Sequence, residues 1–307
     1  MRSLISLRRT LRGAISTLLC LLMLGVSGCG NSTDPLSGSR PTDGSVVVGS
    51  QAYYSNEIIA EIYAQALEHA GWTVTRRMGI GQRDAYMPAL RSGELTVFPE
   101  YTGNLLQYFR PETTARASAD VAAALIDALP AGLSVLEPAA AADQDTYTVT
   151  AQFAADHQLR TLSDLSRVPG TLRLGGPAEL EHRPYGPAGL ESTYGVHAQF
   201  HPTGDTTMQD LLAGTIDVAN VFSADPRIAT HGLVTLADDR HLFLASQVVP
   251  LVDSQRAAEL APILNAVSRE LTTADLRELN VASTEEQRGA GQIARRWLEA
   301  HPRALQG

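Results

Sequence analysis

Apolar and polar residues alternate along this chain in a way that predicts short strands and amphipathic helices in turn. The first strand is an apolar run at residues 46–49, and a helix is predicted at residues 56–70. This helix has apolar side chains at i, i+3 and i+4, the spacing of a helix that covers a sheet, and Gly71 ends it. A second strand at residues 72–75 and a second helix at residues 83–92 follow. This order predicts an α/β fold.

One segment of the pattern occurs twice. At residues 88–104 a helix end with a glycine C-cap leads into a strand that ends in Tyr101, and turn-forming residues follow. A similar segment occupies residues 211–223, with these matches: Leu90 with Leu211, Gly93 with Gly214, Leu95 with Ile216, Val97 with Val218, Tyr101 with Phe222 and Thr102 with Ser223. We therefore expect each half of the chain to deliver an aromatic side chain into a cleft.

The remaining pattern contains further strands and helices. A strand at residues 172–174 runs into Gly175-Gly176-Pro177, and loops at the carboxyl ends of strands hold ligands in open α/β sheets. A long apolar strand is predicted at residues 243–252. Helices are predicted in the tail at residues 255–271, 273–279 and 284–300.

The length of 307 residues allows two hydrophobic cores, and two domains are the natural expectation. In the most economical arrangement the chain builds part of a first α/β domain at residues 45–142. It then forms a second domain at residues 143–242 and completes the first domain at residues 243–307. Two crossings between the domains would make a hinge.

The first 28 residues predict a secretory signal, because four arginines precede an apolar core at residues 14–26 that is too short to span a membrane comfortably. The small residues before Cys29 resemble the lipobox of bacterial lipoproteins, in which the cysteine carries a lipid and becomes the N-terminus. An ordinary signal followed by a chance cysteine is the alternative. Residues 29–45 are predicted to be a flexible tether to the extracytoplasmic side of the cell membrane.

The charge of the chain argues against nucleic acid as a partner. All 24 basic residues are arginines, and removal of residues 1–28 leaves 20 of them against 33 acidic residues, a net charge of −13. A chain this acidic repels the phosphate backbone.

The residue types that support catalysis or metal binding are scarce. The two cysteines, Cys20 and Cys29, lie in or at the end of the signal, so no thiol remains for a disulfide, a zinc site or a nucleophile. His197 and His201 are four residues apart, but Pro202 and a predicted strand argue for surface or core histidines rather than metal ligands. Residues 79–84 have an aspartate where a dinucleotide motif needs its third glycine. With no hydrolase, zincin or P-loop motif, we expect no cofactor, no metal and no enzymatic activity.

Several short segments, taken in order, resemble the substrate-binding proteins of ABC transporters for osmoprotectants such as glycine betaine, carnitine and choline. They are Val-Val-Val-Gly-Ser at 46–50, Glu-Ile-Tyr-Ala-Gln-Ala-Leu-Glu at 61–68, Pro-Glu-Tyr-Thr-Gly at 99–103, Thr-Leu-Ser-Asp-Leu at 161–165, Arg-Pro-Tyr-Gly at 183–186, Leu-Ala-Asp-Asp at 236–239 and Glu-Leu-Asn at 278–280. The resemblance implies a type II periplasmic-binding-protein fold, in which two α/β domains close on a solute. It also implies partners, an ABC permease with its ATPase subunits.

The resemblance further implies an aromatic cage between the domains. A quaternary ammonium cannot donate a hydrogen bond, so ring faces must hold it, while a carboxylate on the same solute needs donors such as arginine. Of four cage tyrosines in the family pattern, this chain keeps Tyr101 and Tyr147. Phe222 stands in place of the third and Met208 in place of the fourth. Each of these side chains could instead be ordinary packing.

Four more positions carry over from the family. Arg183 occupies the position of the family's arginine that binds the carboxylate of the solute. Asp145 occupies the position at which a backbone carbonyl approaches the methyl groups of the solute. Gln51 replaces a residue that is often lysine, and Asn104 replaces a usual threonine. Because Met208, Phe222 and Gln51 depart from the pattern, a more apolar or aromatic solute is the alternative to a betaine.

Overall fold

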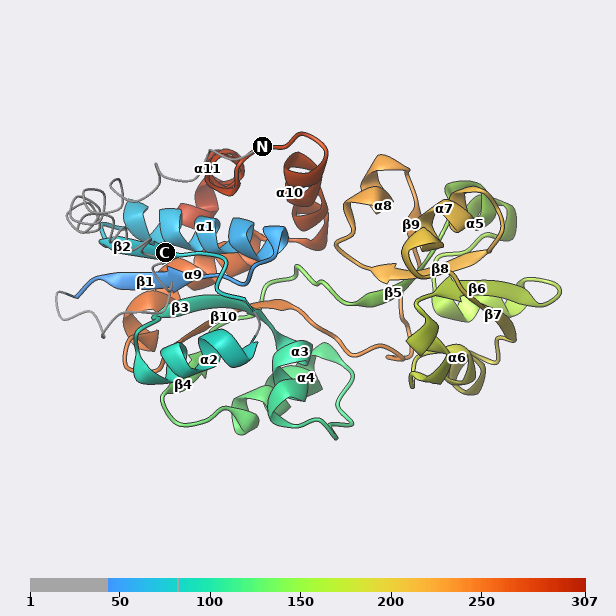
Figure 1. The fold of residues 1–307 in the computed structure, drawn as a ribbon, viewed down its shortest axis with the longest axis horizontal. Coiled ribbons are helices and arrows are strands. Elements are labelled where there is room, and N and C mark those ends of the chain that lie inside the picture. The colour runs from blue at the N-terminus through green and yellow to red at the C-terminus, as the bar shows by residue number, and fades with distance from the viewer. Residues whose placement is uncertain (1–43, 82) are drawn as a thin grey trace, which may run out of the picture. The chain divides into compact units, whose positions relative to one another are not determined.

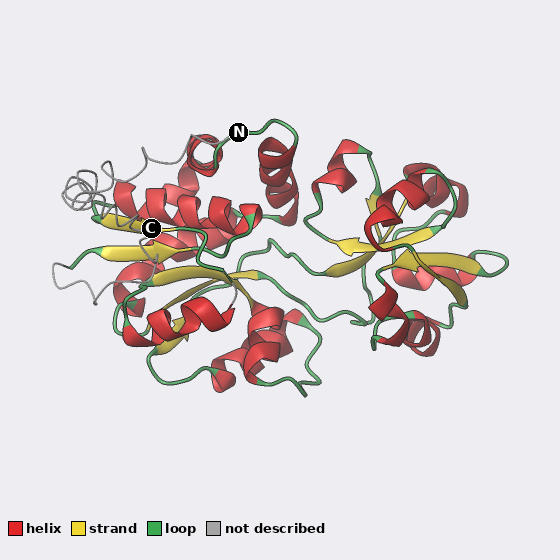
Figure 2. Ribbon diagram, viewed as in Figure 1, coloured by secondary structure: helices red, strands yellow, loops and turns green. Residues whose placement is uncertain are grey.

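The computed structural model describes residues 44–81 and 83–307, which form two five-stranded sheets, each flanked by helices (Figures 1 and 2). The predicted signal, Cys29 and nearly all of the predicted tether lie outside the described residues. Among the residues that are described, no helix combines the length and the apolar character that a membrane crossing requires.

The first sheet has the strand order β2-β1-β3-β10-β4. Strands β1, β2 and β3 are parallel, whereas β10 runs antiparallel to β3 and β4. The bounds are β1 (Val46–Gly49), β2 (Val74–Arg77), β3 (Val97–Tyr101), β4 (Leu133–Val135) and β10 (Val248–Asp253). The helices of this part are α1 (Tyr54–His69), α2 (Arg83–Ser92), α3 (Thr102–Phe109), α4 (Ser118–Ala128), α9 (Ala257–Glu270), α10 (Thr273–Thr284) and α11 (Ala290–Ala300), with a 3-10 helix at Pro302–Leu305.

Helix α1 lies on one face of this sheet, and α2, α3 and α4 lie on the other (Figure 1). The apolar stripe of α1 explains this position, because Ile58, Ile62 and Leu67 are fully buried in the core that α1 forms with β1, β3 and α11. The helix predicted at residues 56–70 is thereby confirmed with a start two residues earlier.

The second sheet has the strand order β7-β6-β8-β5-β9. Strands β6, β7 and β8 are parallel, and β5 is antiparallel to β8 and β9. The bounds are β5 (Asp145–Val149), β6 (Leu172–Gly176), β7 (Ala198–Pro202), β8 (Val218–Phe222) and β9 (Val234–Thr235). The helices are α5 (Ala151–His157), α6 (Pro187–Tyr194), α7 (Thr207–Leu212) and α8 (Pro226–Thr230), with 3-10 helices at Leu162–Arg167, Ala178–His182 and Gly204–Thr206.

The two sheets repeat one arrangement of three parallel strands, one antiparallel strand and an edge strand. The repeat read from the sequence occupies matching places, since β3 and β8 are both the third strand of their sheets. Gly93 and Gly214 each follow a helix with a positive φ of 77° and 71°, a conformation that favours glycine. Each amide also donates to the carbonyl three residues earlier, in Leu90 and Leu211, at 3.1 Å. The internal repeat predicted from the sequence is therefore also a repeat in the structure.

Several local predictions were wrong, and the helix predicted at residues 284–300 begins only at Ala290. The residues after Tyr101 begin helix α3 directly and do not form a turn. The strand predicted at residues 243–252 begins only at Val248. Phe243 lies before the strand, and its ring packs edge-on against Tyr147 with ring centroids 5.0 Å apart.

The chain passes from the first sheet to the second between β4 and β5, and it returns between β9 and β10. The two connections are bonded to each other, with a bridge between Ala142 and Gln247 and a hydrogen bond of 3.1 Å from the Asp143 amide to the Ser246 carbonyl. The two-crossing α/β fold predicted from the sequence is thus confirmed. The domain boundaries at residues 142/143 and 242/243 fall within these connections and stay predictions.

Candidate functional site

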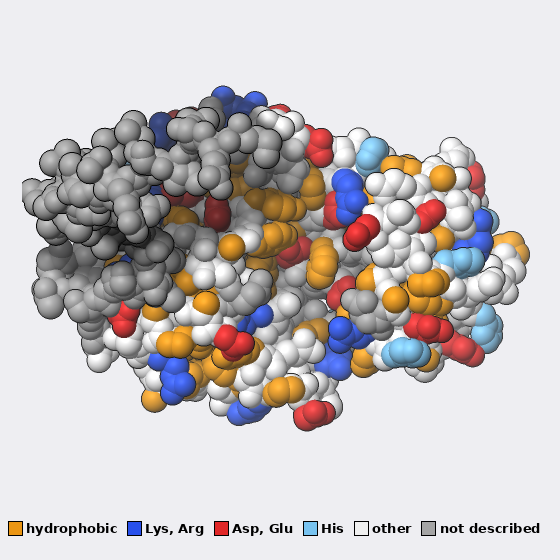
Figure 3. Space-filling model, in the orientation of Figure 1, with side chains coloured by type: hydrophobic (Ala, Val, Ile, Leu, Met, Phe, Trp, Pro, Cys, Tyr) orange, Lys and Arg blue, Asp and Glu red, His pale blue; other side chains and the backbone are white. Residues whose placement is uncertain are grey.

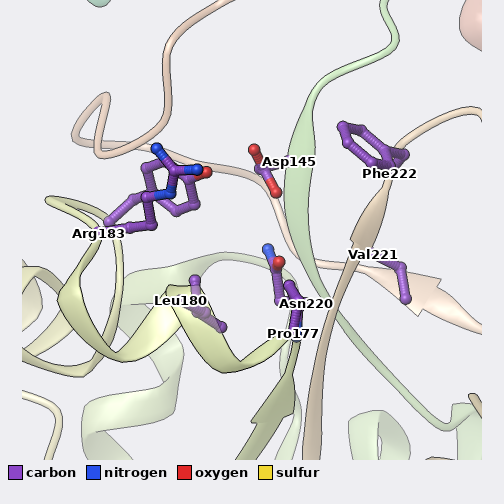
Figure 4. Close-up of a pocket in the computed structure, with 8 residues that line it drawn as sticks. Asp145, Pro177, Leu180, Arg183, Asn220, Val221 and Phe222 are labelled. Atoms are coloured by element: carbon purple, nitrogen blue, oxygen red, sulfur yellow. The ribbon is translucent and has the colours of Figure 1, made fainter. Parts of the chain in front are cut away.

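A cavity of about 330 Å³ lies at the carboxyl ends of β6 and β8, the edge at which open α/β sheets bind ligands. In Figure 4, Arg183 lies on one side of it and Phe222 on the other, with Asp145 and Asn220 between them. The lining residues are Asp145, Pro177, Leu180, Arg183, Tyr185, Asn220, Val221 and Phe222. Three of the predicted site residues therefore share one cavity.

The register of β5 and β8 sets this arrangement. Asp145 lies opposite Phe222, and Tyr147 lies opposite Asn220. Directly opposed residues in an antiparallel pair leave the same face of a sheet, and residues two apart along a strand do so as well. All four side chains consequently leave one face, with Asp145 and Phe222 outermost. Phe222 keeps 57% of its surface exposed, an unusual condition for a large apolar side chain.

Arg183 is held in place by a tight loop. Its amide donates to the Leu180 carbonyl at 3.1 Å, and the Gly186 amide donates to the Arg183 carbonyl at 2.9 Å. A Cβ on Gly186 would lie 2.0 Å from the Leu180 carbonyl oxygen, so only glycine fits at that position. The Arg-Pro-Tyr-Gly segment thus fixes the backbone from which an exposed guanidinium extends.

Tyr147 lies beneath the cavity rather than in its wall. Its side chain is fully buried, its hydroxyl donates to the Tyr185 carbonyl, and burial raises its pKa. Its ring packs against Phe243, which also lies 5.5 Å from the Tyr185 ring. Tyr147 therefore supports the loop that carries Tyr185, a lining residue that the sequence analysis left out of the site.

A second cavity of about 440 Å³ shares Asp145, Arg183, Tyr185 and Phe222 with the first. It adds residues from α3, from the loop before α4, from the loop before α6 and from both connections between the sheets: Asn104, Gln107, Pro111, Glu112, Thr113, Thr114, Arg116, Asp143, Gln144, Pro184, Leu244 and Ser246. Asn104 is thereby brought to the same region as Arg183 and Phe222. Arg116 and Gln144 could not be found from the sequence, because they belong to irregular segments with no pattern.

Hydrogen bonds link the residues of this second cavity across the connections. The Ser246 hydroxyl donates to Asn104 Oδ1, and the Ser246 amide donates to Gln144 Oε1 at 3.0 Å. The Gln144 amide in turn donates to Ser223 Oγ at 3.1 Å. A continuous polar network therefore runs from α3 to the end of β8.

Gly103 explains how α3 can approach this network so closely. A Cβ at this position would lie 2.5 Å from the Ala245 carbonyl oxygen and 2.9 Å from Leu244 Cγ. The glycine of the Pro-Glu-Tyr-Thr-Gly segment therefore permits contact between a helix start and the returning connection, and not the turn that its sequence predicts.

Besides Tyr147, three predicted site residues line neither cavity. Tyr101 is 7% exposed, and burial raises the pKa of its hydroxyl, for which the described residues provide no hydrogen-bond partner. Gln51 is half-buried, and its amide donates to Asn56 Oδ1 at 2.9 Å. Met208 is 2% exposed and lies in a small apolar cluster of α7, β8 and α8.

Asp143, which lines the second cavity, carries a carboxylate with a raised pKa. Burial raises its pKa, opposed by hydrogen bonds from the Ala224 amide at 3.3 Å and the Tyr53 hydroxyl at 3.2 Å. The neighbouring carboxylates of Asp225 and Asp145 raise it further. Burial and neighbouring negative charge both disfavour the ionised form of a carboxyl group.

The two histidines considered in the sequence lie apart from these cavities. His197 is exposed and pairs with Glu191 at 3.2 Å, and His201 belongs to β7. On the face shown in Figure 3, histidine side chains are separated from one another. Within the described part of the chain, no three histidine, cysteine or acidic side chains come together as metal ligands would.

Comparison with known proteins gives a family over most of the chain. Residues 44–300 match the model of the substrate-binding domain of ABC-type glycine betaine transport systems. The glycine betaine-binding protein YehZ of Escherichia coli is 27% identical over 284 residues, which cover 86% of this chain and 92% of YehZ. A glycine-betaine-binding protein of Pseudomonas aeruginosa is also 27% identical, over 83% of this chain and 87% of its own length.

Solved structures show the same fold. A crystal structure titled as a glycine betaine/carnitine/choline ABC transporter matches with a TM-score of 0.78 at 21% identity, covering 84% of this chain and 99% of that one. The structure of apo YehZ from E. coli matches with a TM-score of 0.74 at 26% identity, covering 83% and 98%. The family is one of binding proteins and not of enzymes. The chain therefore belongs to the substrate-binding domain family of ABC-type glycine betaine transport systems, as its sequence motifs predict.

Proposed function

We propose that this protein captures a small quaternary ammonium zwitterion of the glycine betaine type and delivers it to an ABC permease. The observation that carries this proposal is the meeting of an exposed aromatic ring, a carboxylate and a guanidinium in one cavity, supplied by Phe222, Asp145 and Arg183. A betaine has a permanent cation at one end and a carboxylate at the other. The cavity offers a complementary group for each.

The roles of the three groups follow from their chemistry. A trimethylammonium group gains about 0.5–2 kcal/mol from a ring face and is attracted by a nearby carboxylate, which suits Phe222 and Asp145. The carboxylate of the solute suits Arg183, whose planar fork can donate two parallel hydrogen bonds. Tyr185 and Asn220 line the space between these ends.

The remaining predicted residues would enter the site through domain movement. We propose that a domain of residues 45–142 and 243–307 closes on a domain of residues 143–242 when solute binds, because only closure brings both sets of groups to one ligand. Tyr101, Asn104 and Gln51 would then complete the site from the first domain. Tyr147 and Met208 support it from below, since both are buried.

Calorimetry on the purified protein tests the proposal. We expect heats of binding with glycine betaine, weaker binding with choline and carnitine, and none with glycine, which lacks the methyl groups. Failure of every quaternary ammonium in the panel to bind would overturn the proposal.

A more apolar or aromatic solute is a second candidate, favoured by the replacement of a family tyrosine by Phe222 and by Leu244 in the larger cavity. The same calorimeter decides between the two, with benzyltrimethylammonium as the probe. Binding of this compound at least tenfold tighter than glycine betaine favours the second candidate, and the reverse order excludes it.

We also propose that a lipid on Cys29 holds the protein at the extracytoplasmic face of the cell membrane, where a permease and its ATPase subunits are within reach. The sequence around Cys29 supports this. Replacement Cys29→Ser is expected to move the protein from the membrane fraction to the soluble fraction. Retention of the variant in the membrane fraction would contradict the proposal.

A further inference from the structure

The corner at the end of β8, residues 222–225, includes the exposed ring of Phe222. Part of its support comes from elements that pack with the first sheet. Ser223 and Ala224 are 5% and 2% exposed. Ala224 belongs to the apolar core built around α1, although β8 itself belongs to the second sheet. The corner is therefore embedded among residues that pack with the first sheet.

Two side chains of α10, Arg277 and Asn280, donate hydrogen bonds to the carbonyl groups of this corner, and these contacts form the grip. Asn280, which is fully buried, donates from Nδ2 to the Ala224 oxygen at 2.9 Å. Arg277 donates from Nε to the Ser223 oxygen at 2.6 Å and from its terminal nitrogen to Thr235 Oγ1 at 3.3 Å. These two carbonyls immediately follow Phe222, so the grip is one residue away from the proposed ligand wall.

The opposite side of the corner is bonded to the first connection between the sheets. The Ser223 amide donates to the Gln144 carbonyl at 2.8 Å, and its hydroxyl donates to the Ala142 carbonyl at 2.7 Å. The Ala224 amide donates to Asp143. The corner is thus fixed between α10 and a connecting segment.

Arg277 donates its hydrogen bonds to uncharged oxygen atoms. The acceptors that the structure gives it are neutral oxygens, and burial lowers its pKa. A charged donor forms a stronger hydrogen bond to a carbonyl than a neutral donor does, and its fork can hold two acceptors in fixed geometry. These properties suit a residue that positions backbone and does not bind solute.

We propose that Arg277 and Asn280 are positioning residues, which fix the β8 corner against α10 and so hold Phe222 and Asp145 in place for the ligand. The proposal rests on the proposed function, since it assigns these residues to the same site. It gives a role to the Glu-Leu-Asn segment at residues 278–280. It also supplies a third, non-covalent connection between the parts that carry the two sheets.

The grip matters for affinity because a wall that is already ordered loses less conformational freedom when the ligand binds. Without it, residues 222–225 must be ordered at the moment of binding. The affinity for solute then falls although no ligand contact is removed.

Hydrogen exchange and calorimetry on the same variants test this inference. Arg277→Gln removes the charge and the fork, and Arg277→Lys keeps the charge alone. Arg295→Gln, an exposed arginine on α11, is the matched control. We expect amides 222–225 of Arg277→Gln to exchange about tenfold faster without ligand, and the affinity for glycine betaine to fall about tenfold, or 1.4 kcal/mol. The lysine variant should lie between this variant and the wild type.

Two results would overturn the inference. Unchanged exchange at amides 222–225 in folded Arg277→Gln shows that the grip holds nothing, and faster exchange with unchanged affinity shows that it does not serve the site. Asn280→Ala gives the same test should Arg277→Gln fail to fold. If the wild type binds no quaternary ammonium, the proposed function fails, and the exchange measurement still decides whether α10 fixes the corner.

Discussion

Asp145 and Phe222 lie directly opposite each other on neighbouring antiparallel strands, and their side chains leave the same face of the sheet. A carboxylate and an exposed ring face are the two kinds of group that attract a cation unable to donate hydrogen bonds. Strand pairing alone places them side by side, so the proposed cation end of the site depends on the register of β5 and β8.

Replacement of the exposed ring should weaken binding with little effect on folding. For Phe222→Ala we expect the affinity for glycine betaine to fall about 2- to 30-fold, the equivalent of 0.5–2 kcal/mol for one ring face. Because 57% of Phe222 is exposed, its loss should change the free energy of unfolding by less than about 0.5 kcal/mol. Titration calorimetry and urea denaturation measure the two quantities. Leu212→Ala, a 44% exposed side chain on α7, is the control that should leave affinity unchanged.

Arg183 should matter only for solutes with a carboxylate. Arg183→Gln is expected to reduce the affinity for glycine betaine roughly 10- to 150-fold, from the loss of a charged hydrogen bond worth about 1.5–3 kcal/mol. Choline has no carboxylate, and its affinity should stay the same. An equal loss for both solutes would assign Arg183 to general packing of the cavity and not to the anion. The exposed Arg160 provides the control substitution Arg160→Gln.

The buried carboxylate of Asp143 should make stability fall as pH rises. Its pKa lies above the usual 3.8, so in the range above pH 4 the folded state binds more protons than the unfolded state does. Folding is then disfavoured progressively as the group is forced to ionise. For Asp143→Asn we expect the stability difference, variant minus wild type, to increase between pH 4 and pH 7 in urea denaturation. A difference that is constant or decreases with pH would contradict the assignment.

Breaking the ion pair behind Tyr101 should be among the most destabilising single replacements in the part of the chain built around the first sheet. Glu100 is fully buried and accepts hydrogen bonds from Arg83 at 2.9 and 2.7 Å and from the Tyr101 amide at 3.0 Å. Arg83→Met would leave this carboxylate without its cation, at a cost of about 3–5 kcal/mol.

An exposed pair provides the comparison. Arg269 and Glu137 are paired at 3.1 Å with about half of each side chain exposed, and Arg269→Met should cost less than about 1 kcal/mol. The double replacement Arg83→Met with Glu100→Gln should recover part of the loss. Thermal or urea denaturation of the four proteins measures this, and equal losses for Arg83→Met and Arg269→Met would refute the interpretation.

The fold could be predicted because its signals are local and repeated. Gly93 and Gly214 end helices in the left-handed conformation, and the strands that follow hold the same place in each sheet. Such features depend on residue type and spacing, which the sequence displays directly. The match between Tyr101 and Phe222 came from the same spacing.

The solvent exposure of the two matched aromatic side chains could not be predicted in the same way. Tyr101 is 7% exposed and Phe222 is 57% exposed, although both end the third strand of a sheet. Their exposure depends on which side chains from distant segments pack against each strand end. The spacing of residues along one strand does not reveal those contacts. For the same reason Asn220, which lines the cavity, had no signal in the sequence, and Tyr185 was not assigned to the site although it lies in the Arg-Pro-Tyr-Gly segment.

The equal strand order of the two sheets has a consequence for how the chain could be divided. Each connection leaves an edge strand of one sheet and enters the antiparallel strand of the other, β5 or β10, which pairs directly with β8 or β3. A cut at either connection separates β10 from β3 and β4 of the first sheet, whereas the strands of the second sheet, β5 to β9, stay on one polypeptide. The first sheet therefore depends on both connections for its folding, and a protease that severs either one breaks the covalent link between β10 and the strand that ends in Tyr101.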